Sequence, residues 1–79
     1  MLKLNILNLK KFLATVNSCE NEVYIISSDG TKVNINKQYT AQDNLWEEYN
    51  KNKNYLHLTL KVSNPKDYMS IVSYYAGDC

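Results

Sequence analysis

Residues 55–62, YLHLTLKV, alternate between strongly apolar and more polar side chains. A period of two is typical of a β-strand with one face in the core and the other toward water. Residues 2–6, LKLNI, alternate in the same way. Parallel strands that are buried on both faces would instead form continuous apolar runs. The pattern therefore predicts an antiparallel sheet that is covered on one side only.

A β-hairpin is predicted over residues 22–36. Asp29 and Gly30 lie near its middle, and both residue types tolerate the positive φ angles of a two-residue type I′ turn. We therefore expect a type I′ turn at this position. The inward-facing side chains of the two strands would be those of Val23, Ile25, Val33 and Ile35.

Three further segments have the spacing of amphipathic helices. Asn8 is the expected N-cap of the first helix, Thr40 that of the second, and Asn64 that of the third, where Pro65 takes the first helical position. The first helix should end near residues 17–19. The expected apolar stripes are Leu9, Phe12, Leu13 and Val16; then Leu45, Trp46 and Tyr49; then Tyr68, Ile71, Val72 and Tyr75.

The resulting order is β-α-β-β-α-β-α. Each strand has one polar face, so the helices must all cover the other face. Apolar residues make up 44% of the 79 residues, enough for one packed core. We predict an α+β fold, a two-layer open-faced sandwich with a four-stranded antiparallel sheet, in a single domain over residues 1–79.

Positive and negative charges nearly balance, with nine lysines against eight carboxylates and a net charge of +1. Binding to nucleic acids or membrane surfaces usually relies on an excess of basic groups. We therefore predict no nucleic-acid partner and no membrane insertion. The chain also has no arginine, the usual bidentate ligand of phosphate. Tight anion recognition would have to use lysine, backbone amides or helix N-termini.

Metal binding and catalysis are both disfavoured. Cys19, Cys79 and the single histidine, His57, do not have the spacing of metal ligands. No helix N-terminus is expected beside Cys19 to activate its thiol, and His57 falls on the polar face of its strand. With no signal peptide visible, both cysteines are expected to be reduced thiols of a cytoplasmic protein. We predict a protein that is not an enzyme and has no metal or other cofactor.

The order of elements, together with the hairpin VYIISSDGTKVNIN at residues 23–36, resembles HPr, the histidine-containing phosphocarrier of the bacterial sugar phosphotransferase system. The resemblance implies a phosphorylated histidine near Asn5, at the start of the first helix, but residues 5–8 read NILN. It also implies a regulatory serine, and Lys37 occupies that position. Both phosphorylation sites are therefore missing.

The resemblance further implies that the chain acts by contacting a protein. The HPr contact surface lies at the starts of the first two helices. Carried over by position, this surface would comprise Asn5, Asn8, Lys37, Gln38, Tyr39 and Trp46. The implied partner is a protein of the phosphotransferase system or a regulatory protein, in carbohydrate uptake or metabolism. We expect a monomer or a weak dimer.

Three alternatives remain open at the level of sequence. One is a phosphocarrier that uses His57, the single histidine of the chain, in place of the missing one. A ferredoxin-like small-molecule-sensing regulatory domain shares the first six elements, but has the first and third strands in the middle of its sheet. Separately, Trp46 is either half-buried in the core or an exposed anchor for a partner, since tryptophan and tyrosine are enriched in binding hot spots.

Overall fold

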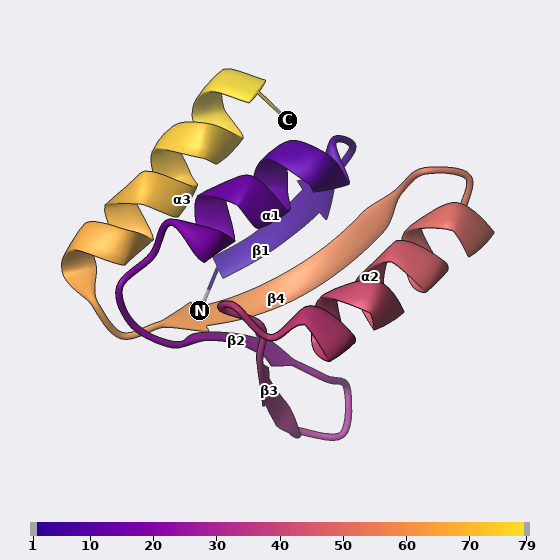
Figure 1. Ribbon diagram of the computed structural model, residues 1–79, viewed down its shortest axis with the longest axis horizontal. Coiled ribbons are helices and arrows are strands. Elements are labelled where there is room, and N and C mark those ends of the chain that lie inside the picture. The colour runs from indigo at the N-terminus through magenta and orange to yellow at the C-terminus, as the bar shows by residue number, and fades with distance from the viewer. Residues whose placement is uncertain (1, 79) are drawn as a thin grey trace.

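The computed structural model describes residues 2–78 and confirms the predicted order of elements (Figure 1). The strands are β1 (Leu2–Ile6), β2 (Val23–Ile26), β3 (Lys32–Asn34) and β4 (Leu56–Val62). The helices are α1 (Leu9–Asn17), α2 (Tyr39–Lys51) and α3 (Pro65–Asp78). Cys79, which we expect to be a reduced thiol, lies outside the described residues.

The four strands form one antiparallel sheet in the order β1-β4-β2-β3. The long central strand β4 pairs with β1 through Leu56–Leu60 and with β2 through Leu60–Val62. A ferredoxin-like fold would have β1 and β3 in the middle, whereas here both are edge strands. The ferredoxin-like alternative is therefore wrong at the level of strand order.

The core lies between the sheet and the helices. The inward-facing residues of β1 and β4 are buried, as their alternation predicts, except that Leu2 and Val62 at the strand ends are only partly buried. Leu4 and Leu58 are directly opposite each other on this buried face. The fully or nearly fully buried apolar residues also include, from the helices, Leu9, Phe12, Leu13, Val16 and Ile71. The other face of the sheet has no helix against it, so the sandwich is open as predicted.

Local capping fixes the starts of α1 and α3. The Asn8 Oδ1 atom accepts a hydrogen bond from the Lys11 amide at 3.1 Å. The Asn64 Oδ1 atom accepts hydrogen bonds from the amides of Lys66 at 2.8 Å and Asp67 at 3.3 Å. Both asparagines satisfy amides that the first turn of a helix leaves unpaired. The two predicted N-caps are confirmed.

Two local predictions are wrong. Gly30 alone in the hairpin turn has a positive φ, of 88°. The Gly30 amide donates to the Ser27 carbonyl at 2.9 Å, and the Ser27 amide donates to the Thr31 carbonyl at 2.8 Å. This arrangement is typical of a three-residue turn closed by a left-handed glycine, so the turn is not type I′. In addition, α2 begins at Tyr39 after Gln38, one residue before the expected cap Thr40.

Candidate functional site

An exposed aromatic cluster joins α2 to the start of α1. The Trp46 and Tyr49 rings meet edge to face, with centroids 5.6 Å apart and planes at 90°. The Tyr49 hydroxyl donates to the Leu7 carbonyl at 2.5 Å. Trp46 is 36% exposed and Leu7 is 56% exposed. We call Trp46 and Tyr49, together with Leu7 to which Tyr49 is bonded, the aromatic cluster.

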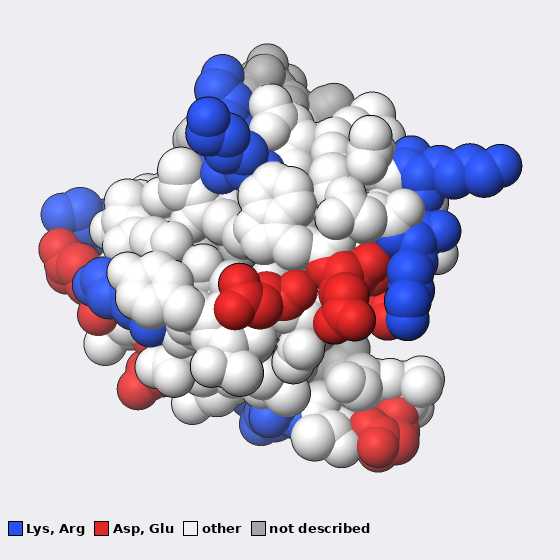
Figure 2. Space-filling view, turned by 45° about the vertical axis from the view of Figure 1, so that its right-hand side comes forward, with Lys and Arg blue, Asp and Glu red and all other residues white. Residues whose placement is uncertain are grey.

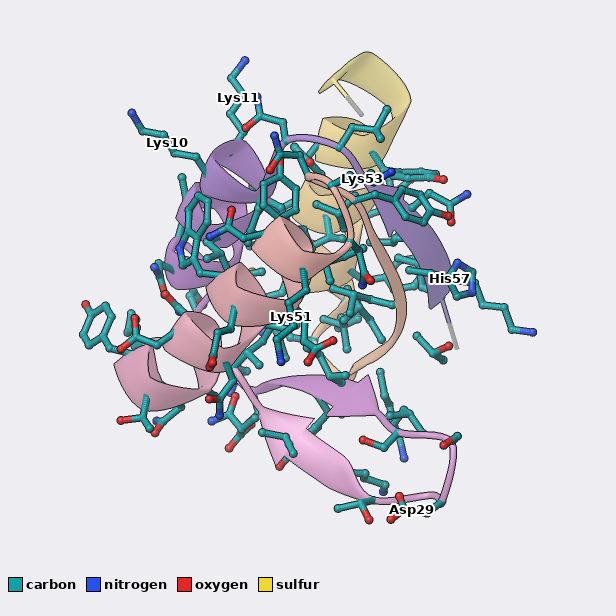
Figure 3. All side chains as sticks on the ribbon, turned by 90° about the vertical axis from the view of Figure 1, so that its right-hand side faces the viewer. Lys10, Lys11, Asp29, Lys51, Lys53 and His57 are labelled. Atoms are coloured by element: carbon teal, nitrogen blue, oxygen red, sulfur yellow. The ribbon has the colours of Figure 1, made fainter. Side chains whose placement is uncertain are left out.

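The aromatic cluster lies in a mixed electrostatic setting. Lys10 and Lys11 are exposed in the first turn of α1, on the helix side of the molecule (Figure 3). Exposed carboxylates run along α2, and Figure 2 shows acidic side chains crossing the middle of this side, with lysines above them and to their right. A partner that covers the cluster would therefore meet both signs of charge around an apolar centre, the usual composition of a protein interface.

The three predicted contact residues that precede or open α2 lie at the far end of α1 from Asn8. The Lys37 amide donates to the Asn17 Oδ1 atom at 3.0 Å, and the Lys37 Nζ atom lies 3.4 Å from the Cys19 carbonyl. Gln38 precedes α2 without a side-chain capping bond, and Tyr39 is 69% exposed. The length of α1 therefore separates these residues from Asn8.

Asn5 lies on the other side of the molecule. The Asn5 Oδ1 atom accepts a hydrogen bond from the Tyr55 hydroxyl at 2.9 Å and lies 2.7 Å from the His57 Nδ1 atom. Because an amide oxygen only accepts hydrogen bonds, this contact requires the proton on Nδ1. Asn5 and His57 are paired across β1 and β4 on the open face. The six predicted contact residues thus do not form one continuous surface.

The sequence analysis missed a buried polar network around the connection from α1 to β2. The Asp67 carboxylate, 3% exposed, accepts hydrogen bonds from the amides of Glu20 at 3.1 Å and Asn21 at 2.9 Å. The Asn36 Nδ2 atom donates to the carbonyls of Cys19 at 3.1 Å and Asn21 at 2.6 Å. These bonds join residues 15 to 47 positions apart, so no local pattern indicates them. The network holds a connection in place and offers no open site.

Cys19 is part of the core. Its side chain is 2% exposed, and its Sγ atom lies 3.4 Å from the Thr15 carbonyl. Burial, together with the nearby Asp67 carboxylate, raises the pKa of the Cys19 thiol to about 11, although the Lys37 charge acts in the opposite direction. At neutral pH the thiol is therefore protonated. This environment is unsuited to a nucleophile, which requires the thiolate.

Native Cys19 should resist alkylation. In a Cys79→Ser variant, we expect iodoacetamide at pH 8 to react with Cys19 about a hundredfold more slowly in the native protein than in urea, since two pKa units separate the thiols. Stability should also fall as the pH rises above about 9, because the unfolded thiol ionises first. Mass spectrometry gives the alkylation rates. Alkylation rates of the native and the unfolded protein within tenfold of each other would contradict a buried Cys19 thiol with a raised pKa.

Comparisons with protein-family models, with curated proteins and with solved structures give no match. Within residues 2–78, no three histidine, cysteine or acidic side chains come together in a way that could hold a metal ion. None of the described helices has the length and apolar character needed to cross a membrane. The class that the geometry defines is thus a small α+β open-faced sandwich with an exposed aromatic cluster.

Proposed function

We propose that this chain is a non-catalytic, HPr-like domain that binds a protein through its helix layer. The strand order supports the proposal, because β4 lies beside both β1 and β2, as the resemblance to HPr implies. The proposed partner is a component of the phosphotransferase system or a regulatory protein, in carbohydrate uptake or metabolism of a bacterium. The proposed site of action is the cytoplasm.

The start of α1 supports a role without phosphate transfer. In HPr this helix N-terminus stabilises the phosphorylated histidine through its free amides. Here the Asn8 side chain occupies the Lys11 amide, and Asn5 stands in place of the histidine with its side chain turned to Tyr55 and His57. Lys37 replaces the regulatory serine, and its positive charge is opposite to that of a phosphate.

The observation that carries the proposal is the exposure of Trp46. A tryptophan on a largely polar helix leaves apolar area in water, and burial of that area against a partner would be favourable. Tyr49 holds the Trp46 ring from one side, so little side-chain freedom would be lost on binding. Rigid, exposed aromatic side chains of this kind are typical anchors of protein interfaces.

The test is affinity capture from lysate of the source organism, followed by measurement of Kd for each recovered protein. We expect Trp46→Ala to weaken binding at least tenfold, since hot-spot residues cost 2 kcal/mol or more when truncated, roughly 30-fold in affinity. Tyr68→Ala is the matched control, because Tyr68 is 38% exposed on α3 and lies outside the aromatic cluster on α2 and the start of α1. Lys37→Glu tests whether the partner also contacts the residues before α2, which lie at the far end of α1.

Two results would overturn the proposal. One is a partner whose affinity is unchanged in both Trp46→Ala and Lys37→Glu. The other is an equal loss in Trp46→Ala and Tyr68→Ala, which would indicate general adhesion of exposed aromatic side chains. Capture of sugar-transport enzymes or of a sugar-responsive regulator, lost in Trp46→Ala alone, would support the HPr-like role.

A further inference from the structure

The open face of the sheet carries a charge that the whole-chain balance conceals. Strand alternation and register place ten side chains on this face, counting Tyr55 directly before β4: Lys3, Asn5, Tyr24, Ile26, Lys32, Asn34, Tyr55, His57, Thr59 and Lys61. Three of these side chains are lysines and none is acidic, although Glu22, directly before β2, falls at one end of the same face. The charged side chains of the strands on this face are thus all positive, although the whole chain has a net charge of only +1.

Two of these lysines come close together although their strands are not neighbours. Tyr24 of β2 is paired with Lys61 of β4, and Ile26 of β2 with Lys32 of β3. The Lys61 side chain lowers the pKa of Lys32, because the two amino groups interact and their like charges repel each other. An anion bound between the two ammonium groups would relieve this repulsion.

Aromatic rings lie on the same face as the lysines. Tyr55 is 39% exposed and is oriented by its hydrogen bond to Asn5, and His57 also contacts Asn5. Figure 3 shows His57 projecting from the side of the sheet away from α2. Tyr24 lies half-buried on β2, beside Lys61. The face thus carries Tyr55 and His57 at one end of β4 and a third ring, Tyr24, beside Lys61.

A hollow widens this face where the sheet is incomplete. Between Leu56 and Thr59, β4 has β1 on one side but no partner residue from β2 on the other. A hollow of about 750 Å³ lies there, with Lys3, His57 and Thr59 in its wall. Ser27 and Ser28 line it from the hairpin, and Glu48 from α2 is the only carboxylate among its lining residues within the described chain. Its volume is that of an ordinary ligand pocket.

We infer that the open face of the sheet binds single-stranded RNA, with phosphates on Lys3, Lys32 and Lys61 and bases stacked on Tyr24, Tyr55 and His57. An acidic peptide would satisfy the lysines but would leave the flat rings without stacking partners, whereas single strands use both. The amide, hydroxyl and imidazole groups among the lysines can donate and accept, as contact with a ribose 2′-hydroxyl requires. This site is separate from the aromatic cluster on the helix layer.

Fluorescence anisotropy with a labelled oligouridine of eight nucleotides tests the inference. We expect measurable binding at 50 mM salt that weakens as salt rises, with a log–log slope of about −2 for three phosphate contacts. The double variant Lys32→Gln, Lys61→Gln should reduce the slope by about 1.4 and weaken binding about tenfold or more. Tyr55→Ala should weaken binding at least about fivefold, because a stacked base is lost.

The matched control is Lys10→Gln with Lys11→Gln, which changes the net charge by the same amount on the helix side of the molecule (Figure 3). This pair should leave the affinity within about twofold, because Lys10 and Lys11 lie on the helix side of the molecule (Figure 3), away from the bound strand, and salt screens their charge. Thermal unfolding checks that each variant is folded.

Several outcomes would overturn the inference. They are no binding below millimolar RNA at 50 mM salt, an equal loss in the control pair, tighter binding of oligothymidine than of oligouridine, or displacement of the RNA by polyglutamate at matched charge. The first two would remove the basic face as a site. The third would assign the site to DNA, and the fourth to an acidic protein.

Discussion

Replacement of Asp67 by alanine is expected to lower the free energy of unfolding by about 3 kcal/mol. The Asp67 carboxylate is buried and accepts two backbone hydrogen bonds, from Glu20 and Asn21. Alanine would leave both partly buried amides without their carboxylate acceptor, and each such loss costs about 1 to 3 kcal/mol. A domain of 79 residues has a total stability of roughly 4 to 12 kcal/mol, so the loss is large.

Urea unfolding followed by circular dichroism measures the effect of Asp67→Ala. Asp43→Ala is the control, because Asp43 is an exposed carboxylate on α2 and its loss should cost less than about 0.5 kcal/mol. The cost of Asp67→Asn should lie between the costs of Asp67→Ala and Asp43→Ala, since the asparagine amide retains one acceptor oxygen for two donors. A cost below 0.5 kcal/mol for Asp67→Ala would show that the connection from α1 to β2 does not depend on this carboxylate.

The parts of the fold that follow from short-range rules were predictable. Alternation in β1 and β4 decides which face of each strand is buried, and the asparagines before α1 and α3 satisfy the first helical amides. Both features depend on residues a few positions apart, so the sequence shows them directly. The open-faced architecture then follows because strands with one polar face leave only one side for the helices.

The start of α2 was not predictable in this way. Thr40 has the residue type and spacing of an N-cap, but the helix begins earlier, with Gln38 in the cap position and no side-chain capping bond. Gln42 instead donates hydrogen bonds to the Asn17 Oδ1 atom at 2.7 Å and the Ile35 carbonyl at 2.8 Å. The contact with Asn17 spans 25 positions, and such tertiary bonds override the weaker local preference.

The candidate surfaces depend on tertiary arrangement even more strongly. Positions carried over from HPr named Asn8 and Lys37 together, but α1 separates them because Lys37 bonds to Asn17 at its far end. The proximity of Lys32 and Lys61 requires the register of three strands, which the sequence does not specify. Composition alone therefore indicated a nearly neutral chain, although the structure separates its charges by face.

The largest expected loss of stability among the aromatic residues is that of Phe12→Ala, about 3 to 5 kcal/mol. Phe12 is fully buried between α1 and the sheet, and its ring centroid lies 5.9 Å from that of Tyr74. Alanine would remove most of the ring volume from the core, and the surrounding strands can close such a cavity only in part. Against a total stability of roughly 4 to 12 kcal/mol, this loss brings the domain near its unfolding threshold.

Comparison of Phe12→Ala with Trp46→Ala distinguishes Phe12, an aromatic residue of the core, from Trp46, the proposed binding residue. Trp46→Ala should cost at most about 1 kcal/mol, because its ring remains partly in water and fills no core position. Phe12→Leu should restore more than half of the loss in Phe12→Ala, since leucine fills most of the cavity. Thermal unfolding of the three variants measures these differences. A loss in Trp46→Ala equal to that in Phe12→Ala would make Trp46 a core residue, and any weakening of partner binding in that variant would then follow from unfolding.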